Sequence, residues 1–186
     1  VDQIVQHFDL TQGIPLMSNL MIPSKLNSII IAGNTGSGKS LATQAICEFL
    51  VRTPNVRLIY VDPKKSAGAR WARGKPQIKL FVPKKGERLE EYLIRITAML
   101  SQEVKLIFEK QDALFLRSTK VDTNAGEINQ PKTWIVIEEL EALEAMGTKR
   151  ELDDLFHQLL LISLLGREAY TNLLLSMQVP RNDILP

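Results

Sequence analysis

The sequence has very little cysteine, no long hydrophobic run and no repeated segment. Its 186 residues include a single cysteine, Cys47, which cannot form a disulfide within the chain and fits a reducing cytosol. No stretch approaches the ~18–20 uninterrupted apolar residues that a membrane-spanning helix needs. Internal repeats, low-complexity tracts and a signal-peptide pattern are also missing. These absences exclude a disulfide-stabilised scaffold, a repeat array and a membrane span, and we expect a cytoplasmic domain.

Charge is nearly balanced overall but uneven along the chain. The formal net charge is only +2, with 45% apolar and 24% charged residues, an ordinary composition for one globular domain. Between Lys64 and Arg88, however, nine basic residues stand against one acid, Glu87. Such a segment in a near-neutral domain suggests a local surface that faces a polyanion. The alternative interpretation is a solvated surface loop.

Short apolar runs rich in β-branched residues alternate along the chain with longer segments of helical periodicity. The predicted strands are residues 29–32, 58–61, 134–137 and 173–177, with a short one within 78–82. The predicted helices are residues 41–51, 87–117 and 151–165. Residues 1–27 are expected to form an N-terminal hairpin or cover segment, residues 64–85 an irregular stretch, and residues 119–132 a mobile loop. This order predicts an α/β fold with a mostly parallel sheet flanked by helices on both faces.

A glycine-rich phosphate loop, the Walker A motif, lies between the first predicted core strand and the first predicted helix. Its glycines let successive backbone N–H groups surround a phosphate, and the helix directs its positive N-terminal end at the same oxygens. Lys39 is expected to neutralise the β- and γ-phosphates, and the Ser40 hydroxyl to ligate Mg²⁺. The residues predicted to bind ATP are Gly33, Asn34, Thr35, Gly36, Ser37, Gly38, Lys39, Ser40 and Leu41. A plain glycine-rich turn would not require this placement between strand and helix.

Two adjacent carboxylates, Glu138 and Glu139, follow the strand predicted at residues 134–137. The first can hold the Mg²⁺ shell, and the second can orient and deprotonate the attacking water, as in a Walker B site. That site usually has Asp first, and the extra methylene of Glu138 would bring its carboxylate about 1.5 Å nearer the metal. Weak Mg²⁺ binding is one consequence of this substitution. The alternative interpretation is a solvated acidic start to the next helix.

Gln178 ends the strand predicted at residues 173–177. In nucleotidases with an extra central strand, this strand lies between the phosphate-loop strand and the Walker B strand. A polar side chain at its end can reach the γ-phosphate or the attacking water and report hydrolysis to the rest of the fold. The alternative interpretation is an ordinary strand-end residue before Pro180.

Six segments together resemble the FtsK/SpoIIIE branch of the FtsK–HerA motor ATPases, and the resemblance spans nearly the whole chain. The segments are residues 13–15, 31–40, 60–64, 135–140, 164–169 and 175–180. The phosphate loop alone would indicate only a nucleotidase. Its Thr-Gly-Ser-Gly-Lys-Ser form, the Asp62-Pro63-Lys64 motif and the final Gln-x-Pro indicate this branch.

The resemblance implies a RecA-like P-loop NTPase, a single ATPase domain over residues 1–186. It implies a homohexameric ring that threads double-stranded DNA through its pore and moves it by ATP hydrolysis, in chromosome segregation or conjugative transfer. Carried over by position, Glu138 takes the metal-linked role, Glu139 the catalytic role and Gln178 the sensor role. The family core continues past the equivalent of Pro186, so we expect a C-terminally incomplete fragment. The parent protein then has room for a membrane anchor at the inner face of the cell membrane.

Arg167 and the basic segment 64–88 are further candidates for a functional role. Arg167 is a candidate arginine that acts on the nucleotide of a neighbouring subunit, or else a helix-end residue that stabilises the C-terminal dipole. Lys and Arg within 64–88 can follow DNA phosphates without reading sequence, with Trp71 packed against a sugar or base. Two alternatives to a DNA motor are a related ATPase that moves protein, and a ring module that binds nucleotide but hydrolyses it poorly.

Overall fold

A computed structural model describes residues 13–17, 20–23, 28–119 and 123–178 of the chain. Its main feature is a five-stranded sheet in which every neighbouring pair is parallel. The strands lie in the order β3 (Ser28–Ala32), β7 (Thr171–Met177), β6 (Lys132–Ile137), β4 (Val56–Val61) and β5 (Ile78–Phe81). Because the strands are parallel, all their carboxyl ends meet at one edge of the sheet, here called the carboxyl edge. The opposite edge is called the amino edge.

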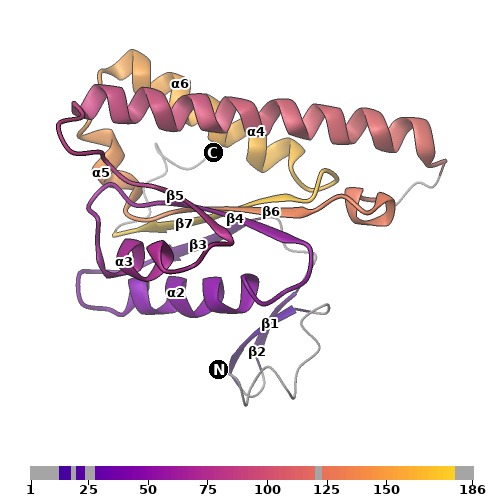
Figure 1. Cartoon of the computed structure of the whole chain (residues 1–186), viewed down its shortest axis with the longest axis horizontal. Helices are drawn as coiled ribbons and strands as arrows, with labels where there is room; N and C mark the ends of the chain where they lie inside the picture. Colours follow the sequence, from indigo (N-terminus) through magenta and orange to yellow (C-terminus); the bar gives the residue numbers. More distant parts are fainter. Residues whose placement is uncertain (1–12, 18–19, 24–27, 120–122, 179–186) are drawn as a thin grey trace.

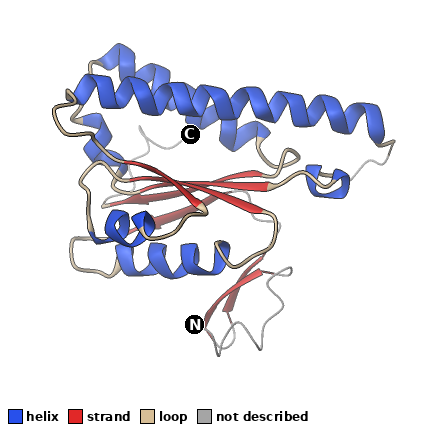
Figure 2. Cartoon of the chain, in the orientation of Figure 1, coloured by secondary structure: helices blue, strands red, loops and turns tan. Residues whose placement is uncertain are grey.

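Helices cover both faces of this sheet, which confirms the predicted α/β class (Figures 1 and 2). The helices on one face are α4 (Leu89–Arg117), α5 (Leu140–Glu144) and α6 (Lys149–Leu165). Those on the other face are α2 (Lys39–Leu50) and α3 (Ala67–Arg73). Among the described residues, no helix combines the length and the hydropathy needed to cross a bilayer.

Side chains alternate between the two faces along each central strand, because successive Cβ atoms of a strand point in opposite directions. The residues of β4 and β6 that share a core with α2 are Leu58, Tyr60, Trp134 and Val136. Those that share a core with α4 and α6 are Ile59, Val61, Ile135 and Ile137. Even-numbered positions of these strands therefore point toward α2, and odd-numbered positions point toward α4.

A small antiparallel hairpin precedes the sheet. It pairs β1 (Gly13–Met17) with β2 (Leu20–Pro23) and lies on the α2 side of the molecule (Figure 1). Ile14 and Ile22 of the hairpin share a buried cluster with Leu50 at the end of α2. The predicted cover segment, residues 1–27, is described only in these two strands. Residues 1–12, 18–19 and 24–27 lie outside the described residues.

The predicted strands and long helices are confirmed to within two residues at most ends, and the corrections concern short elements. The stretch predicted as irregular contains α3, whose first turn is capped by the Ser66 hydroxyl, which accepts from the Gly68 N–H. The predicted loop 119–132 contains a 3-10 helix, η1 (Ala125–Ile128), whose Ala125 N–H donates to the Glu168 carbonyl at 2.7 Å. Its residues 120–122 lie outside the described residues. The short helix α5 follows Glu139 without a periodic signal of its own.

Candidate active site

The phosphate loop connects β3 to α2 at the carboxyl edge of the sheet. Gly36 and Gly38 have φ values of 81° and 90°, in the left-handed region that glycine adopts without strain. A Cβ atom at either position would meet nothing within 4 Å, so the glycines are there for backbone conformation and not for space. The turn is closed by the Ser37 N–H, which donates to the Asn34 carbonyl at 3.1 Å. The loop therefore has the curvature that surrounds a phosphate group.

Lys39 opens α2 and its side chain folds back into the curve of the loop. Its ammonium donates to the carbonyls of Gly33 and Asn34, the latter at 3.1 Å. Gly33 allows this tight curve, because a Cβ atom at this position would lie 2.6 Å from the Ser37 hydroxyl oxygen. A cation, loop N–H groups and the positive end of α2 thus converge on one small volume, the arrangement that binds phosphate.

Glu138 follows β6 and is only 1% exposed, so the interpretation of a solvated acidic start to a helix is wrong for this residue. It continues the even-numbered alternation of β6, and its carboxylate points toward the start of α2. The Tyr60 hydroxyl donates to Oε1 at 2.7 Å, and the Ser40 hydroxyl donates to Oε2 at 3.3 Å. Burial raises the pKa of Glu138, as does the negative charge of Asp62, while the Tyr60 hydrogen bond opposes the rise. Burial also raises the pKa of Tyr60, helped by the Glu138 charge, so the phenol keeps its proton.

These residues suit a Mg²⁺ ion held mainly by phosphates and water. Mg²⁺ prefers oxygen ligands and keeps several waters, so one hydroxyl and one carboxylate are a typical protein contribution. The oxygens of Ser40 and Glu138 lie 3.3 Å apart, close enough to serve the same ion. Within the described part of the chain, no group of three or more His, Cys, Asp or Glu residues is placed to hold a metal without phosphates. The donor set therefore fits Mg²⁺ as part of a nucleotide complex.

Glu139 caps the start of α5 in an unusual backbone conformation, with φ 51° and ψ 65°. Left-handed conformations in residues other than glycine are costly and cluster at functional sites. Its carboxylate forms an ion pair with the Lys64 ammonium, and the side chain is about a quarter exposed, at 26%. Glu139 is thus oriented toward the phosphate loop and is open to solvent water, as a general base must be.

Asp62 builds the turn that brings Lys64 to this carboxylate. Its own carboxylate accepts hydrogen bonds from the N–H groups of Lys64 and Ser66, both at 2.9 Å, and from that of Ala69 at 3.3 Å. The Ser66 hydroxyl donates to it as well, at 2.6 Å. In the Asp62-Pro63-Lys64 motif, Asp62 therefore stabilises the turn and Lys64 belongs to the candidate site. The ion pair places Lys64 beside the predicted catalytic carboxylate, while its role in facing DNA stays a prediction.

Gln178 completes the site from the end of β7. Strand β7 lies between the phosphate-loop strand β3 and the Walker B strand β6, as predicted. The Gln178 N–H donates to the Glu141 carboxylate, which ties the end of the strand to α5. These site residues line one hollow together, and its lining consists of Thr35, Gly36, Gly38, Lys39, Ser40, Leu41, Lys64, Glu139 and Gln178. The structure therefore brings together the loop, Glu139 and Gln178, and adds Lys64, which sequence reasoning missed.

Arg167 does not join this group. It is exposed in the turn between α6 and β7, which leads into the first residue of that strand, at the amino edge of the sheet. The hollow lies at the opposite edge. Arg167 is therefore placed away from the phosphate loop of its own chain, and only contact with another subunit would bring it near a nucleotide.

The basic segment 64–88 contains both exposed cations and residues that are engaged within the protein. Lys75 pairs with Glu48 at 3.1 Å, and the Trp71 indole N–H donates to the same carboxylate at 3.1 Å. Trp71 is therefore held against the protein and is not available to stack on a base. Three other cations, Lys65, Arg70 and Arg73, are exposed and share a second hollow beside β5 with Leu80, Val82 and Pro83. This trio is one exposed group of cations within the segment, and Lys79, Lys84 and Lys85 are exposed as well.

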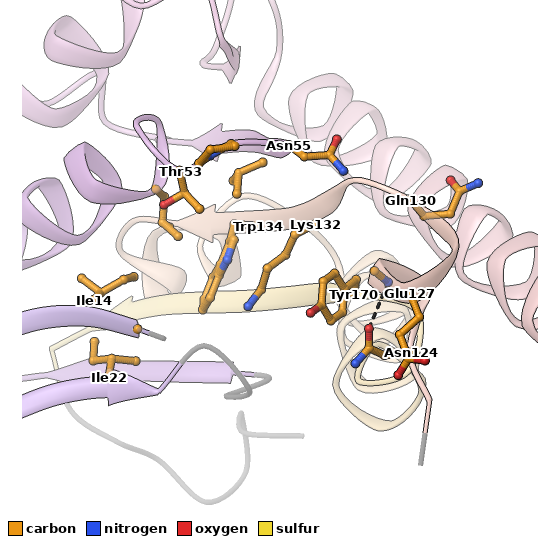
Figure 3. Close-up of a pocket in the computed structure, with 15 residues that line it drawn as sticks. Ile14, Ile22, Thr53, Asn55, Asn124, Glu127, Gln130, Lys132, Trp134 and Tyr170 are labelled. Carbon is orange, nitrogen blue, oxygen red and sulfur yellow. Dashed lines mark hydrogen bonds between the residues drawn. The ribbon is translucent and has the colours of Figure 1, made fainter. Parts of the chain in front are cut away.

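A further hollow lies at the amino edge, between the hairpin and the sheet (Figure 3). Lys132 extends between the rings of Trp134 and Tyr170, with its ammonium 5.5 Å and 5.3 Å from their centroids. Burial lowers the pKa of Lys132 to about 8. Ile14 and Ile22 line the facing wall. None of the residues predicted for nucleotide chemistry lines this hollow.

Comparison with known proteins agrees with this geometry. No protein-family model matches the chain. The DNA translocase FtsK of Lactiplantibacillus plantarum is 23% identical over 184 residues, an alignment that covers 93% of this chain and 22% of that protein. The chain thus spans about a fifth of the length of this relative, 22%. The match confirms the resemblance to FtsK that the motifs predicted.

Solved structures share the fold over most of the chain. The conjugation coupling protein TcpA, in a monomer form with ATPγS, has a TM-score of 0.74 at 20% identity, with 92% of this chain and 48% of that one covered. The cytoplasmic domain of the Thermomonospora curvata type VII secretion ATPase EccC has a TM-score of 0.63 at 23% identity, with 87% and 20% covered. The cytoplasmic domain of EssC has 0.57 at 15% identity, with 86% and 28% covered. These matches confirm the RecA-like P-loop ATPase fold.

Proposed function

We propose that this chain is the ATPase core of a motor that moves double-stranded DNA, as a homohexamer, in chromosome segregation or conjugative transfer. The observation that carries the proposal is the hollow at the carboxyl edge that combines the phosphate loop with Glu139 and Gln178. The FtsK match and the TcpA fold support the DNA substrate, since one is a DNA translocase and the other a conjugation coupling protein. A membrane anchor in the parent protein and a cytoplasmic position of this domain belong to the same proposal.

Hydrolysis in this site divides the work among few residues. The loop N–H groups and Lys39 would hold the ATP phosphates, and Ser40 and Glu138 would hold a Mg²⁺ ion, which would supply positive charge at the phosphate oxygens. Glu139 takes a proton from the water that attacks the γ-phosphorus. Gln178 follows β7, which lies between the phosphate-loop strand and the Walker B strand, so its side chain could respond to loss of the γ-phosphate and transmit a movement to the sheet.

Movement of a protein substrate is the second candidate, favoured by the fold shared with the type VII secretion ATPase EccC. A third candidate, a ring module that binds nucleotide but hydrolyses it slowly, is favoured by Glu138 in place of the usual Asp. The hydrogen bond between Ser40 and Glu138 supports a working metal site and so favours the first two candidates.

DNA is favoured over protein by the hollow that Lys65, Arg70 and Arg73 share. Its lining contains three cations and no acidic residue. Cations grouped in this way can follow a phosphate backbone regardless of base sequence, as a translocating motor requires. Arg70 and Arg73 lie in the last turn of α3, which keeps them on the same side of a short helix.

The rate of ATP hydrolysis with and without linear duplex DNA tests the proposal. We expect stimulation by DNA that disappears at high salt, because the contact is made to phosphates. Hydrolysis that is indifferent to DNA would favour the protein-translocating candidate. Slow hydrolysis under all conditions, with tight nucleotide binding, would favour the ring module.

Charge reversal locates the DNA contact. Changing Lys65, Arg70 and Arg73 together to Glu should weaken duplex binding by at least about tenfold at low salt and flatten its salt dependence. The matched control reverses three exposed cations on α4 and α6, namely Lys105, Lys149 and Arg150. Equal losses in both triple variants would show only a general charge effect and would contradict the assignment of this hollow.

A further inference from the structure

The Glu138 carboxylate is divided between two hydroxyl groups from different elements. Tyr60 of β4 holds Oε1 at 2.7 Å, and Ser40 of α2 meets Oε2 at 3.3 Å. Tyr60 is fully buried, so its hydroxyl has no water to turn to. The phenol is a donor here and the carboxylate an acceptor, which makes this a charge-assisted hydrogen bond of the stronger kind.

The sheet places Tyr60 and Glu138 together for a definite reason. Tyr60 is paired in register with Val136, and the Glu138 N–H donates to the Val61 carbonyl at 2.9 Å. Tyr60 and Glu138 are therefore diagonal neighbours on the same face of two adjacent strands, a separation that long side chains can bridge. Both point toward α2, where Ser40 lies.

The length of the Glu138 side chain explains why a hydrogen bond from Tyr60 is needed. A Glu side chain has one more methylene and one more rotatable bond than the Asp usual at this position, so its carboxylate reaches about 1.5 Å further. A hydroxyl fixed behind one oxygen limits that reach and leaves the other oxygen directed at Ser40. An Asp at position 138 would fall short of the Tyr60 hydroxyl and would not need it.

Helix α3 closes over the phenol and keeps it in place. A Cβ atom on Gly68 would lie 2.3 Å from the Tyr60 hydroxyl oxygen and 3.3 Å from Oε1 of Glu138. Glycine is thus required at the point where the helix backbone approaches the hydrogen bond. The Trp71 ring, one turn further along α3, lies against Tyr60 with the centroids 6.1 Å apart. The phenol therefore has little room to turn away from Glu138.

We propose that Tyr60 is a positioning residue, which sets the reach of Glu138 toward Ser40 and so matches a glutamate to the metal position of the phosphate loop. The assignment rests on the proposed function, since it presumes that Ser40 and Glu138 serve a Mg²⁺–ATP complex. Tyr60 has no direct part in the chemistry. It acts through Glu138, and its effect belongs to metal-dependent binding.

The test is Tyr60→Phe, which removes the hydroxyl and keeps the ring. The readout is the Mg²⁺ concentration that gives half-maximal binding of a fluorescent ATP analogue, measured without turnover. We expect Tyr60→Phe to raise this concentration by about tenfold or more, the size of effect expected for a hydrogen bond to a charged group. Thermal unfolding and circular dichroism of each variant establish that the fold is kept.

The chain contains a matched control. Tyr92 is equally buried, and its hydroxyl donates to the Phe81 carbonyl at 3.1 Å on the α4 face of the sheet. Tyr92→Phe therefore removes a buried tyrosine hydrogen bond away from the site, and we expect an unchanged Mg²⁺ requirement. Equal shifts in Tyr60→Phe and Tyr92→Phe would reduce Tyr60 to a structural residue and overturn the proposal.

A double-mutant cycle with Glu138→Asp gives the sharper result. Because Asp is too short to reach the phenol, we expect Tyr60→Phe to change the Mg²⁺ requirement by less than about twofold in that background. The same shift in both backgrounds would mean that the hydroxyl does not act through the carboxylate, and would overturn the proposal. Should the unsubstituted protein bind the nucleotide without any Mg²⁺ dependence, the proposed function itself fails. That outcome is distinct from a Tyr60 variant that behaves like its control.

Discussion

Strand β6 has an ionisable residue at each end, a half-buried lysine and a buried glutamate, and the two have different surroundings. Lys132 opens the strand at the amino edge and Glu138 follows it at the carboxyl edge, and both point to the α2 side. Burial shifts both in the direction that opposes charge, since it lowers the pKa of Lys132 to about 8 and raises that of Glu138. Glu138 has a hydroxyl at each oxygen, whereas Lys132 lies between the faces of two aromatic rings.

The comparison teaches that the direction of the strands, and not the presence of a hollow, decides where chemistry is located. In a parallel sheet with crossover helices, helix N-termini lie at the carboxyl edge, and their free N–H groups attract anions. The amino edge receives helix C-termini and offers no such donors. The hollow of Figure 3 combines apolar and aromatic side chains with polar ones around Lys132, and it contains no glycine-rich phosphate loop; the polar residues are Thr53, Asn55, Asn124, Glu127 and Gln130.

Glu139→Gln should produce the largest effect, and it tests whether the chemistry is located at the carboxyl edge. Removing a general base costs about 10²–10⁴-fold in turnover, while ATP binding should be retained because the loop is untouched. ATPase rate and nucleotide affinity are the measurements. The control is Glu168→Gln, an exposed carboxylate at the amino edge, which should leave both unchanged. Undiminished hydrolysis by Glu139→Gln would mean that the catalytic carboxylate is misassigned.

Lys64→Met should have an intermediate effect. Without its ion pair, Glu139 loses a partner that orients it, and we expect turnover without DNA to fall about tenfold, in line with coupling inside a charged network. Lys105→Met, an exposed lysine on α4, is the matched control. A loss that appears only in DNA affinity, with DNA-free turnover intact, would return Lys64 to the DNA-facing role predicted from sequence.

Lys132→Met tests the amino edge and should have the smallest effect, on stability alone. Below about pH 8, Lys132 is charged in both the folded and the unfolded chain, and burial of the charge lowers the free energy of unfolding. Between pH 8 and the ordinary value of 10.5, only the folded protein loses the proton, so this penalty is progressively removed. The stability of the unsubstituted protein should therefore rise relative to Lys132→Met between pH 8 and 10, by about 2 kcal/mol. Chemical denaturation at several pH values measures this. A difference between the two proteins that does not change with pH would contradict the burial effect.

Much of the site could be predicted because its parts are local in sequence. The phosphate loop is one continuous segment, and Glu138, Glu139 and Gln178 each end an apolar run whose carboxyl end a parallel sheet must bring to the same edge. The order of β7 between β3 and β6 was predicted with them. Their roles in chemistry stay predictions until the variants are measured.

Lys64 and Tyr60 could not be predicted in the same way. The pairing of Lys64 with Glu139 depends on the turn that Asp62 folds, which joins residues 75 positions apart in the sequence. The contact of Tyr60 with Glu138 depends on the register of β4 against β6, which neither strand determines alone. Helix α3 was missed because its seven residues are too few to show helical periodicity, although Ser66 is a recognisable N-cap residue.

At Glu139, the residue type that would best stabilise the backbone conformation differs from the one that catalysis needs. A left-handed conformation costs a residue with a side chain like that of glutamate about 1–2 kcal/mol, whereas glycine or asparagine adopts it at little cost. Selection for a sturdier protein would therefore favour replacing the very residue that the chemistry requires. A thermophilic relative that keeps glutamate at this position must gain its thermal stability at other positions. A relative that has replaced the glutamate should be more stable but less active.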